Sequence, residues 1–370
     1  MIVHIFNGRQ IHLVAQIAAG FITTYSNSAE HYIVIYGGSE ANKKKYLELF
    51  NEHNFNRYLF AESLLKFAKF VRTIRKEAIL FHAGKYVWFI TALFCGAKNI
   101  NWVCWGAGSA IGNNWKSKLM TPLKSFIYRH FKTIVTLMDE DKATITKDFN
   151  VRLENIRVIS YAPSGTKLEH DALLDSLLEE QHVTPEKPLI LLGNSPREIH
   201  NYIEMLHRLA HLRGKIRVQC MNNYSLKHDE VYNQLIATGE KLFGDDFKSN
   251  EDFYSEMPDY IRYMNTCDIY ICSSITQTGL GAVLYCLRLG KKIYICGKNL
   301  SWIRNHYGAI VYDTNDITDT IVYDELISPL TIEQIYKNRE SVIKDIEHSA
   351  YLWREYIREI DKNQKQATLL

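Results

Sequence analysis

No two of the seven cysteines have the close CxxC spacing of a zinc site or a redox motif. Their number is odd, and most lie inside apolar, strand-like runs, so we expect reduced and buried thiols in a cytoplasmic protein, without structural zinc. The N-terminus lacks a basic segment followed by a long apolar one, which argues against a signal peptide. The longest apolar run, residues 86–97, is far shorter than the roughly 20 residues that cross a bilayer. The sequence therefore predicts no membrane span.

Acidic residues are scarce in the first part of the chain. Residues 1–160 contain 21 Lys and Arg against 11 Asp and Glu, whereas the remainder contains 23 and 30. Residues 64–76 and 114–132 contain no acid at all. Such basic amphipathic helices can bind an anionic membrane surface, although core-facing helices with one solvated face explain them equally well. No zinc finger or RNA-binding strand motif accompanies the charge, so we expect no nucleic-acid partner.

Both halves of the chain alternate strand-like and helix-like segments. In the first half the expected strands are 2–6, 31–38, 78–82, 101–106 and 133–137, with helices at 11–25, 64–76, 86–95 and 115–132. In the second half the expected strands are 189–193, 215–221, a stretch around Phe247, 268–274, 292–297 and 309–313, with helices at 197–213, 229–242, 256–266, 279–289 and 332–361. This alternation predicts an α/β protein with two Rossmann-like parallel-sheet domains facing across a cleft, and ligands at the carboxyl ends of the strands.

The length of 370 residues also favours two domains, since one domain usually takes about 150 residues. Residues 162–188 interrupt the alternation with Pro, Gly and acidic residues, and we interpret them as the connection. The expected domains are residues 1–161, joined by the final helix at about 345–370, and residues 186–344.

The first small-residue turn of the second half follows the apolar run Leu189–Leu192. It consists of Gly193, Asn194 and Ser195 and leads into a helix-like pattern. The unpaired N–H groups at a helix start favour an anion such as a phosphate. The other interpretation is an ordinary capped helix, with Ser195 as the cap.

A second turn of this kind follows residues 268–274, where Gln277, Thr278, Gly279 and Gly281 begin an apolar helix. The glycines either let a ligand approach the backbone or pack the helix closely on the sheet. Because both turns follow strands of one sheet, they open on the same edge and can hold one diphosphate between them.

Five segments carry a resemblance to a known family: FHAG at 81–84, WGAG at 105–108, ILLGNS at 190–195, MPDYIRYMNTCDIYI at 257–271 and QTGLGAVLYCLRLGKKI at 277–293. Together they resemble the bacterial 4-acetamido-4,6-dideoxygalactose transferase family. Its members move this sugar from a TDP donor to a polyprenyl-diphosphate-linked acceptor in enterobacterial common antigen synthesis. The similarity extends from the first strand to Trp353 in the last helix.

The resemblance implies an inverting, metal-independent GT-B glycosyltransferase that acts in bacterial surface polysaccharide synthesis. It implies no cofactor, only a nucleoside diphosphate sugar as donor and a polyprenyl-diphosphate-linked saccharide as acceptor. The expected location is cytoplasmic, as a peripheral protein on the anionic inner face of the cell membrane. TDP and UDP donors both remain open, since one methyl group on the base discriminates weakly.

The resemblance also suggests roles for individual residues. The donor phosphate would be bound by Gly193, Asn194 and Ser195. The opposite side of the phosphate site would be formed by Gln277, Thr278, Gly279 and Gly281. The base or ribose would contact Met221 and Tyr224. The general base would be His82, at the end of the strand 78–82, or Asp141. Without a ligand role, His82 is a core or turn histidine, Met221 is a core residue and Asp141 is a helix cap.

One departure from the family pattern keeps other functions open. The family has an Asp after WGA, where this chain has Gly108 followed by Ser109. A sugar-nucleotide 2-epimerase of the same fold is one alternative. A degenerate member that binds nucleotide without catalysis is the other.

Overall fold

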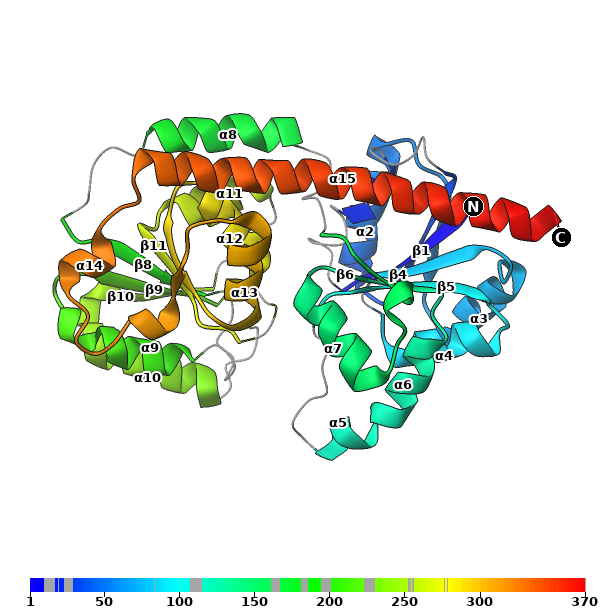
Figure 1. Cartoon of the computed structure of the whole chain (residues 1–370), viewed down its shortest axis with the longest axis horizontal. Helices are drawn as coiled ribbons and strands as arrows, with labels where there is room; N and C mark the ends of the chain where they lie inside the picture. The colour runs from blue at the N-terminus through cyan, green and yellow to red at the C-terminus, as the bar shows by residue number, and fades with distance from the viewer. Residues whose placement is uncertain are drawn as a thin grey trace. The chain divides into compact units, whose positions relative to one another are not determined.

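The computed structural model describes residues 1–9, 17, 18, 20–22, 29–82, 84–106, 115–160, 167–180, 186–193, 201–222, 230–251, 254, 256–275, 277 and 279–369. The chain divides into two compact units, Met1–Lys167 with Asp345–Leu370, and Leu168–Lys344 (Figure 1). Within the described ranges, each unit contains one parallel sheet, of seven strands in the first and six in the second. These sheets confirm the predicted α/β class.

The first unit is built on a sheet in the order β3-β2-β1-β4-β5-β6-β7. Its strands are β1 (Ile2–Asn7), β2 (His31–Tyr36), β3 (Tyr58–Ala61), β4 (Ala78–His82), β5 (Asn99–Cys104), β6 (Thr133–Thr136) and β7 (Ile156–Val158). Its helices are α2 (Glu40–Glu52), α3 (Leu64–Thr73), α4 (Tyr86–Phe94), α5 (Trp115–Leu119), α6 (Thr121–Arg129) and α7 (Asp139–Phe149). The order reverses between β1 and β4, which is where ligands bind in open α/β sheets.

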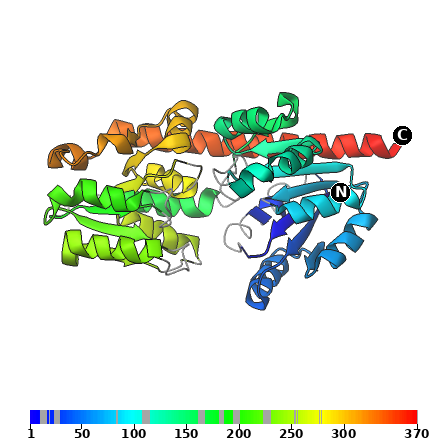
Figure 2. The ribbon, with the colours of Figure 1, turned by 90° about the horizontal axis from the view of Figure 1, so that it is seen from below.

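Both faces of this sheet are covered, because successive side chains of a strand point to opposite faces and those of the central strands are buried on both. Val3 and Ile5 of β1 face a core that includes buried side chains of α3, α4, α6 and α7. Ile2 and Phe6 face the opposite core, with side chains from α2, from residues 17–22 and from the second half of α15 (Ile332–Leu369). Figure 2 shows α15 as one unbroken helix.

The second unit repeats the arrangement, in the order β10-β9-β8-β11-β12-β13. Its strands are β8 (Leu189–Leu192), β9 (Arg217–Met221), β10 (Phe247–Asn250), β11 (Ile269–Cys272), β12 (Lys292–Ile295) and β13 (Tyr312–Asp313). Its helices are α8 (Lys167–Glu179), α9 (Tyr202–Leu209), α10 (Glu230–Phe243), α11 (Met257–Asn265), α12 (Leu280–Arg288), α13 (Gly297–Trp302), α14 (Tyr323–Ile327) and the first part of α15. Here the order reverses between β8 and β11.

Three details differ from the sequence expectations. The expected helix 115–132 is two helices, because the chain breaks at Met120 and Pro122 occupies the start of α6. The expected connection 162–188 contains α8, whose Leu174 is fully buried. Four helices, α2, α7, α13 and α14, and the strands β3 and β7 were not expected at all.

Candidate functional site

The carboxyl edge of the second sheet places its predicted glycine turn at the topological switch point. Gly193 follows β8 directly, and its N–H donates to the Ile271 carbonyl of β11 at 2.7 Å. Its φ of +45° is a left-handed conformation that favours glycine. A Cβ placed there would lie 1.3 Å from the Tyr202 hydroxyl. Only glycine therefore fits this position, and the chain leaves β8 closely packed against the start of α9.

Three buried side-chain oxygens at this edge have no hydrogen-bond partner within the described structure: Asn222 Oδ1, Ser273 Oγ and Gln277 Oε1. Asn222 follows β9, Ser273 follows β11, and Gln277 lies between β11 and α12. The Asn222 amide is held in place, because its Nδ2 donates to Ser249 Oγ at 2.5 Å and its backbone N–H to the Asn250 carbonyl at 2.8 Å. Buried polar atoms in native proteins almost always have a partner, so these three oxygens mark a candidate site for a polar ligand.

The start of α12 adds backbone donors to the same edge. Gly279 is its N-cap, with φ +69° and no side-chain capping hydrogen bond. The first-turn N–H groups therefore have no intrahelical partner and bear the positive end of the helix dipole. A Cβ on Gly281 would meet no atom within 4 Å, so space lies over this turn. Amide donors beside open space suit a diphosphate.

The remaining predicted donor residues divide into two groups. Met221, the last residue of β9, is fully buried. Asn194, Ser195, Tyr224 and Thr278 lie outside the described residues. Sequence reasoning missed Asn222 and Ser273, although each is the first polar residue after an apolar strand, which is the signal that would have found them.

The carboxyl edge of the first sheet places His82 at the end of β4, beside β1. Its Nε2 lies 3.0 Å from His4 Nδ1, and His4 Nε2 lies 2.8 Å from His31 Nδ1. The His82 ring stacks on Phe6 with ring centroids 4.3 Å apart. Burial lowers the pKa of His82 well below its usual value, and burial together with the two neighbouring histidines does the same for His4. The sequence analysis did not foresee this array.

These lowered pKa values predict loss of stability in acid. The unfolded chain takes up protons on these histidines below about pH 6.5, whereas the folded chain does not. The free energy of unfolding should therefore fall as the pH drops from 6.5, by up to about 1.4 kcal/mol per pH unit for each histidine. Urea unfolding between pH 8 and 5 measures this slope. His4→Leu should reduce it, and Phe21→Leu, which disturbs the same cluster without removing a titrating group, should not. Equal slopes in both variants would contradict the prediction.

Asp141, the other predicted base, lies in the first turn of α7 and is fully buried. A carboxylate in that turn interacts favourably with the helix dipole. The predicted alternative, a helix cap, is wrong, because Met138 is the N-cap of α7 and makes no side-chain capping hydrogen bond.

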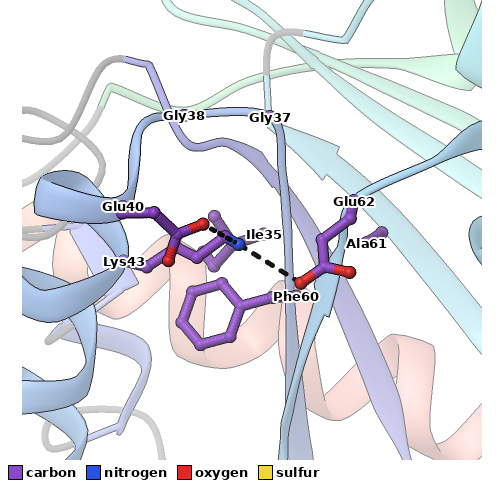
Figure 3. Close-up of a pocket in the computed structure, with 8 residues that line it drawn as sticks. All are labelled: Ile35, Gly37, Gly38, Glu40, Lys43, Phe60, Ala61 and Glu62. Atoms are coloured by element: carbon purple, nitrogen blue, oxygen red, sulfur yellow. Dashed lines mark hydrogen bonds and ion pairs between the residues drawn. The ribbon is translucent and has the colours of Figure 1, made fainter.

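A pocket of about 330 Å³ opens at the carboxyl ends of β2 and β3 (Figure 3). It is lined by Ile35, Gly37, Gly38, Glu40, Lys43, Phe60, Ala61 and Glu62. Figure 3 shows the Lys43 ammonium between two carboxylates, 2.6 Å from Glu40 and 3.2 Å from Glu62. The pocket contains neither His82 nor Asp141. Gly8 lies behind its wall, since a Cβ on Gly38 would lie 2.8 Å from the Gly8 carbonyl oxygen.

The profile of the family described as 4-alpha-L-fucosyltransferase, glycosyl transferase group 56, matches residues 14–335. The chain belongs to this family. The match confirms the predicted family and makes the chain a glycosyltransferase. No curated protein matches it at the level of sequence.

Solved structures place this group 56 chain in the GT-B fold. A glycosyltransferase from Rickettsia africae is 16% identical with a TM-score of 0.69, and each chain covers 98% of the other. HepE of Anabaena, in complex with UDP and glucose, is 11% identical with a TM-score of 0.66 and full coverage of both chains. Trehalose 6-phosphate synthase from Burkholderia multivorans is 9% identical with a TM-score of 0.66, over 100% of this chain and 98% of that one.

Neither a metal-binding cluster nor a membrane-spanning helix occurs in the described residues of this group 56 chain. They contain no cluster of three or more His, Cys, Asp or Glu side chains arranged to hold a metal ion. Within the same residues, no helix is both long and apolar enough to cross a membrane.

Proposed function

We propose that this chain is an inverting glycosyltransferase that moves a hexose, such as a deoxy-amino sugar, from a TDP- or UDP-sugar to a lipid-linked saccharide. The observation that carries the donor half is the carboxyl edge of the second sheet. There the oxygens of Asn222, Ser273 and Gln277, without a partner in the described structure, lie at the same sheet edge as the uncapped start of α12. HepE, of similar fold, is in complex with UDP and glucose in one structure and with UDP-glucose in another, which supports a nucleotide donor for this chain.

Each unit would supply different groups for the transfer. The departing diphosphate needs positive or N–H groups, which the start of α12 and the turn after Gly193 supply. The acceptor hydroxyl needs a base, for which His82 and Asp141 are the candidates in the first unit. With these groups the reaction proceeds without a metal ion.

Substitution of Gly281 tests the donor site. Gly281→Ala should raise the free energy of unfolding by about 0.5–1 kcal/mol, because glycine is a poor helix residue. Gly281→Trp should weaken UDP or TDP binding at least tenfold, because the indole fills the space where the diphosphate would lie. Isothermal titration measures the affinity. Ala237→Trp, at an exposed position of α10, is the matched control and should bind normally. Unchanged affinity in Gly281→Trp would remove the diphosphate from this edge.

A donor incubated without acceptor distinguishes the alternatives. An epimerase would convert the sugar of the donor. The fold of this chain is similar to that of UDP-GlcNAc 2-epimerase from Neisseria meningitidis, with a TM-score of 0.56. The proposed transferase leaves the sugar unchanged or hydrolyses it slowly. A binding subunit without catalysis would bind nucleotide and transfer nothing to extracted polyprenyl-linked lipids. Gly108, whose identity raised that alternative, lies outside the described residues.

Helices α5 and α6 offer a surface for the lipid-linked acceptor. Trp115, Leu119 and Phe126 are 68%, 70% and 51% exposed on them. Lys118 and Arg129 are exposed on the same helices, and no acidic residue occurs between 105 and 138. Exposed apolar side chains interspersed with basic ones suit an anionic bilayer surface, into which the apolar groups insert. We therefore place the membrane-facing side of the first unit on these two helices.

Sedimentation with vesicles tests this surface. The triple variant Trp115→Ser, Leu119→Ser, Phe126→Ser should bind phosphatidylglycerol vesicles at least tenfold more weakly, since burying each such side chain contributes up to about 1.5–3 kcal/mol. Leu153→Ser removes an equally exposed apolar side chain from another part of the unit and should bind normally. If the triple variant sediments like the unchanged chain, the proposed surface is wrong.

A further inference from the structure

Three histidines form one hydrogen-bonded array inside the first unit. His4 and His82 are 0% exposed, and His31 is 4% exposed. The strand register sets His31 level with Ile2 at the start of β2, His4 in the middle of β1, and His82 at the end of β4. The array thus runs along one face of the sheet from its amino side to its carboxyl edge.

Among the described residues, aromatic side chains pack against the array. Phe21 lies 4.3 Å from the His4 ring and 5.2 Å from the His82 ring, centroid to centroid, and Trp353 packs edge-on against Phe21 at 5.5 Å. A buried polar group that loses its partner costs about 1–3 kcal/mol. Leucine or phenylalanine would fill these positions without that risk. A packing role alone therefore leaves three adjoining imidazoles unexplained.

Hydrogen bonding restricts the array to two proton arrangements. A neutral imidazole has one N–H and one lone pair, so His4 must donate to one neighbour and accept from the other. In the first arrangement all three rings carry the proton on Nε2, and the N–H groups point from His82 through His4 to His31. In the second, all three carry it on Nδ1 and the direction reverses. The tautomer of His82 is thereby tied to that of His31.

We infer that His82, His4 and His31 form a proton relay for the acceptor hydroxyl. The relay starts with all three rings protonated on Nε2. As the sugar bonds to the acceptor oxygen, the O–H bond breaks and its proton binds His82 Nδ1. The Nε2 proton of His82 passes to His4 Nδ1, and the Nε2 proton of His4 passes to His31 Nδ1.

The positive charge then resides on His31, away from the reacting atoms. When the product has left, the protons return through the same atoms and one departs from His82 Nδ1 to water. The step needs no further reactant. His82 is the group that meets the acceptor, and His4 and His31 act through it as positioning residues. The relay rests on the proposed transferase function.

Charges near the two ends of the array are compatible with this cycle. Burial keeps the pKa of His4 and of His82 low, so both are neutral before the reaction. At the amino side, Glu30 precedes His31 and pairs with Arg57 at 3.2 Å, and Glu77 precedes β4 and pairs with the Met1 amino group at 3.3 Å. Asp141, in the first turn of α7, is the carboxylate that the first unit offers as the competing base.

Nuclear magnetic resonance of the full chain with ¹⁵N-labelled histidine tests the array without requiring activity. At pH 7.5 we expect His82 and His4 to be neutral and protonated on Nε2, and Nδ1 of His31 to accept from His4. In His4→Phe, which keeps an aromatic ring but breaks both hydrogen bonds with His4, the fraction of His82 protonated on Nδ1 should rise. Protonation of His82 on Nδ1 in the unchanged chain, or a tautomer indifferent to His4→Phe, would overturn the relay.

Kinetics of His31→Gln test whether His31 must take up a proton or only needs to accept the hydrogen bond from His4. The glutamine amide oxygen can still accept from His4, so His82 should keep its tautomer, but an amide cannot take up the proton. We expect kcat to fall at least tenfold with KM values unchanged. Trp353→Phe, which disturbs the cover over Phe21 without touching an imidazole, should retain full kcat. Full kcat in His31→Gln would overturn the relay. Failure of the proposed function gives another result, because the unchanged chain would then transfer no sugar. In that case the NMR tautomers alone would show whether the three histidines form the hydrogen-bonded array.

Discussion

Gly193→Ala is expected to lower the free energy of unfolding by about 3 kcal/mol and to abolish nucleotide binding. A left-handed backbone costs an alanine about 1–2 kcal/mol, and forcing an extra methyl group into a packed site typically costs a further 1–3 kcal/mol. The methyl group would overlap the Tyr202 hydroxyl, so the start of α9 or the turn after β8 must shift. Either shift displaces the turn that we propose as the phosphate cradle. Urea unfolding and isothermal titration with UDP and TDP measure the two effects.

Gly214 provides the matched control. Its φ is +80°, and a Cβ there would meet no atom within 4 Å. Gly214→Ala should therefore show only the backbone cost of about 1–2 kcal/mol and leave nucleotide binding intact. In a double-mutant cycle with Tyr202→Ala, the two losses of stability should be less than additive, because the clash partner is gone. Equal destabilisation by the two glycine substitutions would show that the close packing at Gly193 contributes nothing.

The central strands could be predicted because burial on both faces makes them continuous apolar runs. Leu189–Leu192 is fully buried as β8, and Ala78–His82 as β4. The edge strands gave no such signal, since β3 is mostly half-buried and β7 has an exposed Arg157 at its centre. Helix α8 was missed because its flanking Pro and Gly residues suggested a connection. Its Leu178 reaches the turn at Gly290, a contact that no local pattern reveals.

The candidate site was predictable only where one short segment contains its signal. The turns at Gly193 and Gly279 were visible because small residues follow apolar strands. The Asn222 side chain becomes informative only when β10 supplies Ser249 to hold it and its oxygen remains unpartnered. The histidine array is equally non-local, since His4 lies 78 residues from His82 and 27 from His31 in sequence.

The second large expected effect is a loss of kcat when the candidate base His82 is replaced. His82→Ala should lower kcat by about 10²- to 10⁴-fold, the usual contribution of a general base. Donor affinity should stay unchanged, because His82 belongs to the first unit and the proposed donor groups to the second. Steady-state kinetics at saturating donor, with isothermal titration of the nucleotide, separate the two quantities.

Asp141→Asn keeps the shape of the side chain and removes its charge. It should lower the stability of α7 by about 0.3–1 kcal/mol through the helix dipole and leave kcat within a fewfold of normal.

The reasoning that favours His82 over Asp141 is electrostatic. Both side chains are 0% exposed, so either meets an acceptor only after its cover opens. A buried neutral imidazole is available as a base at physiological pH, since its lowered pKa keeps it unprotonated. The carboxylate of Asp141 lies in the first turn of α7, where it interacts favourably with the positive end of the helix. A large loss of kcat in Asp141→Asn together with normal turnover in His82→Ala would reverse this assignment and remove the relay with it.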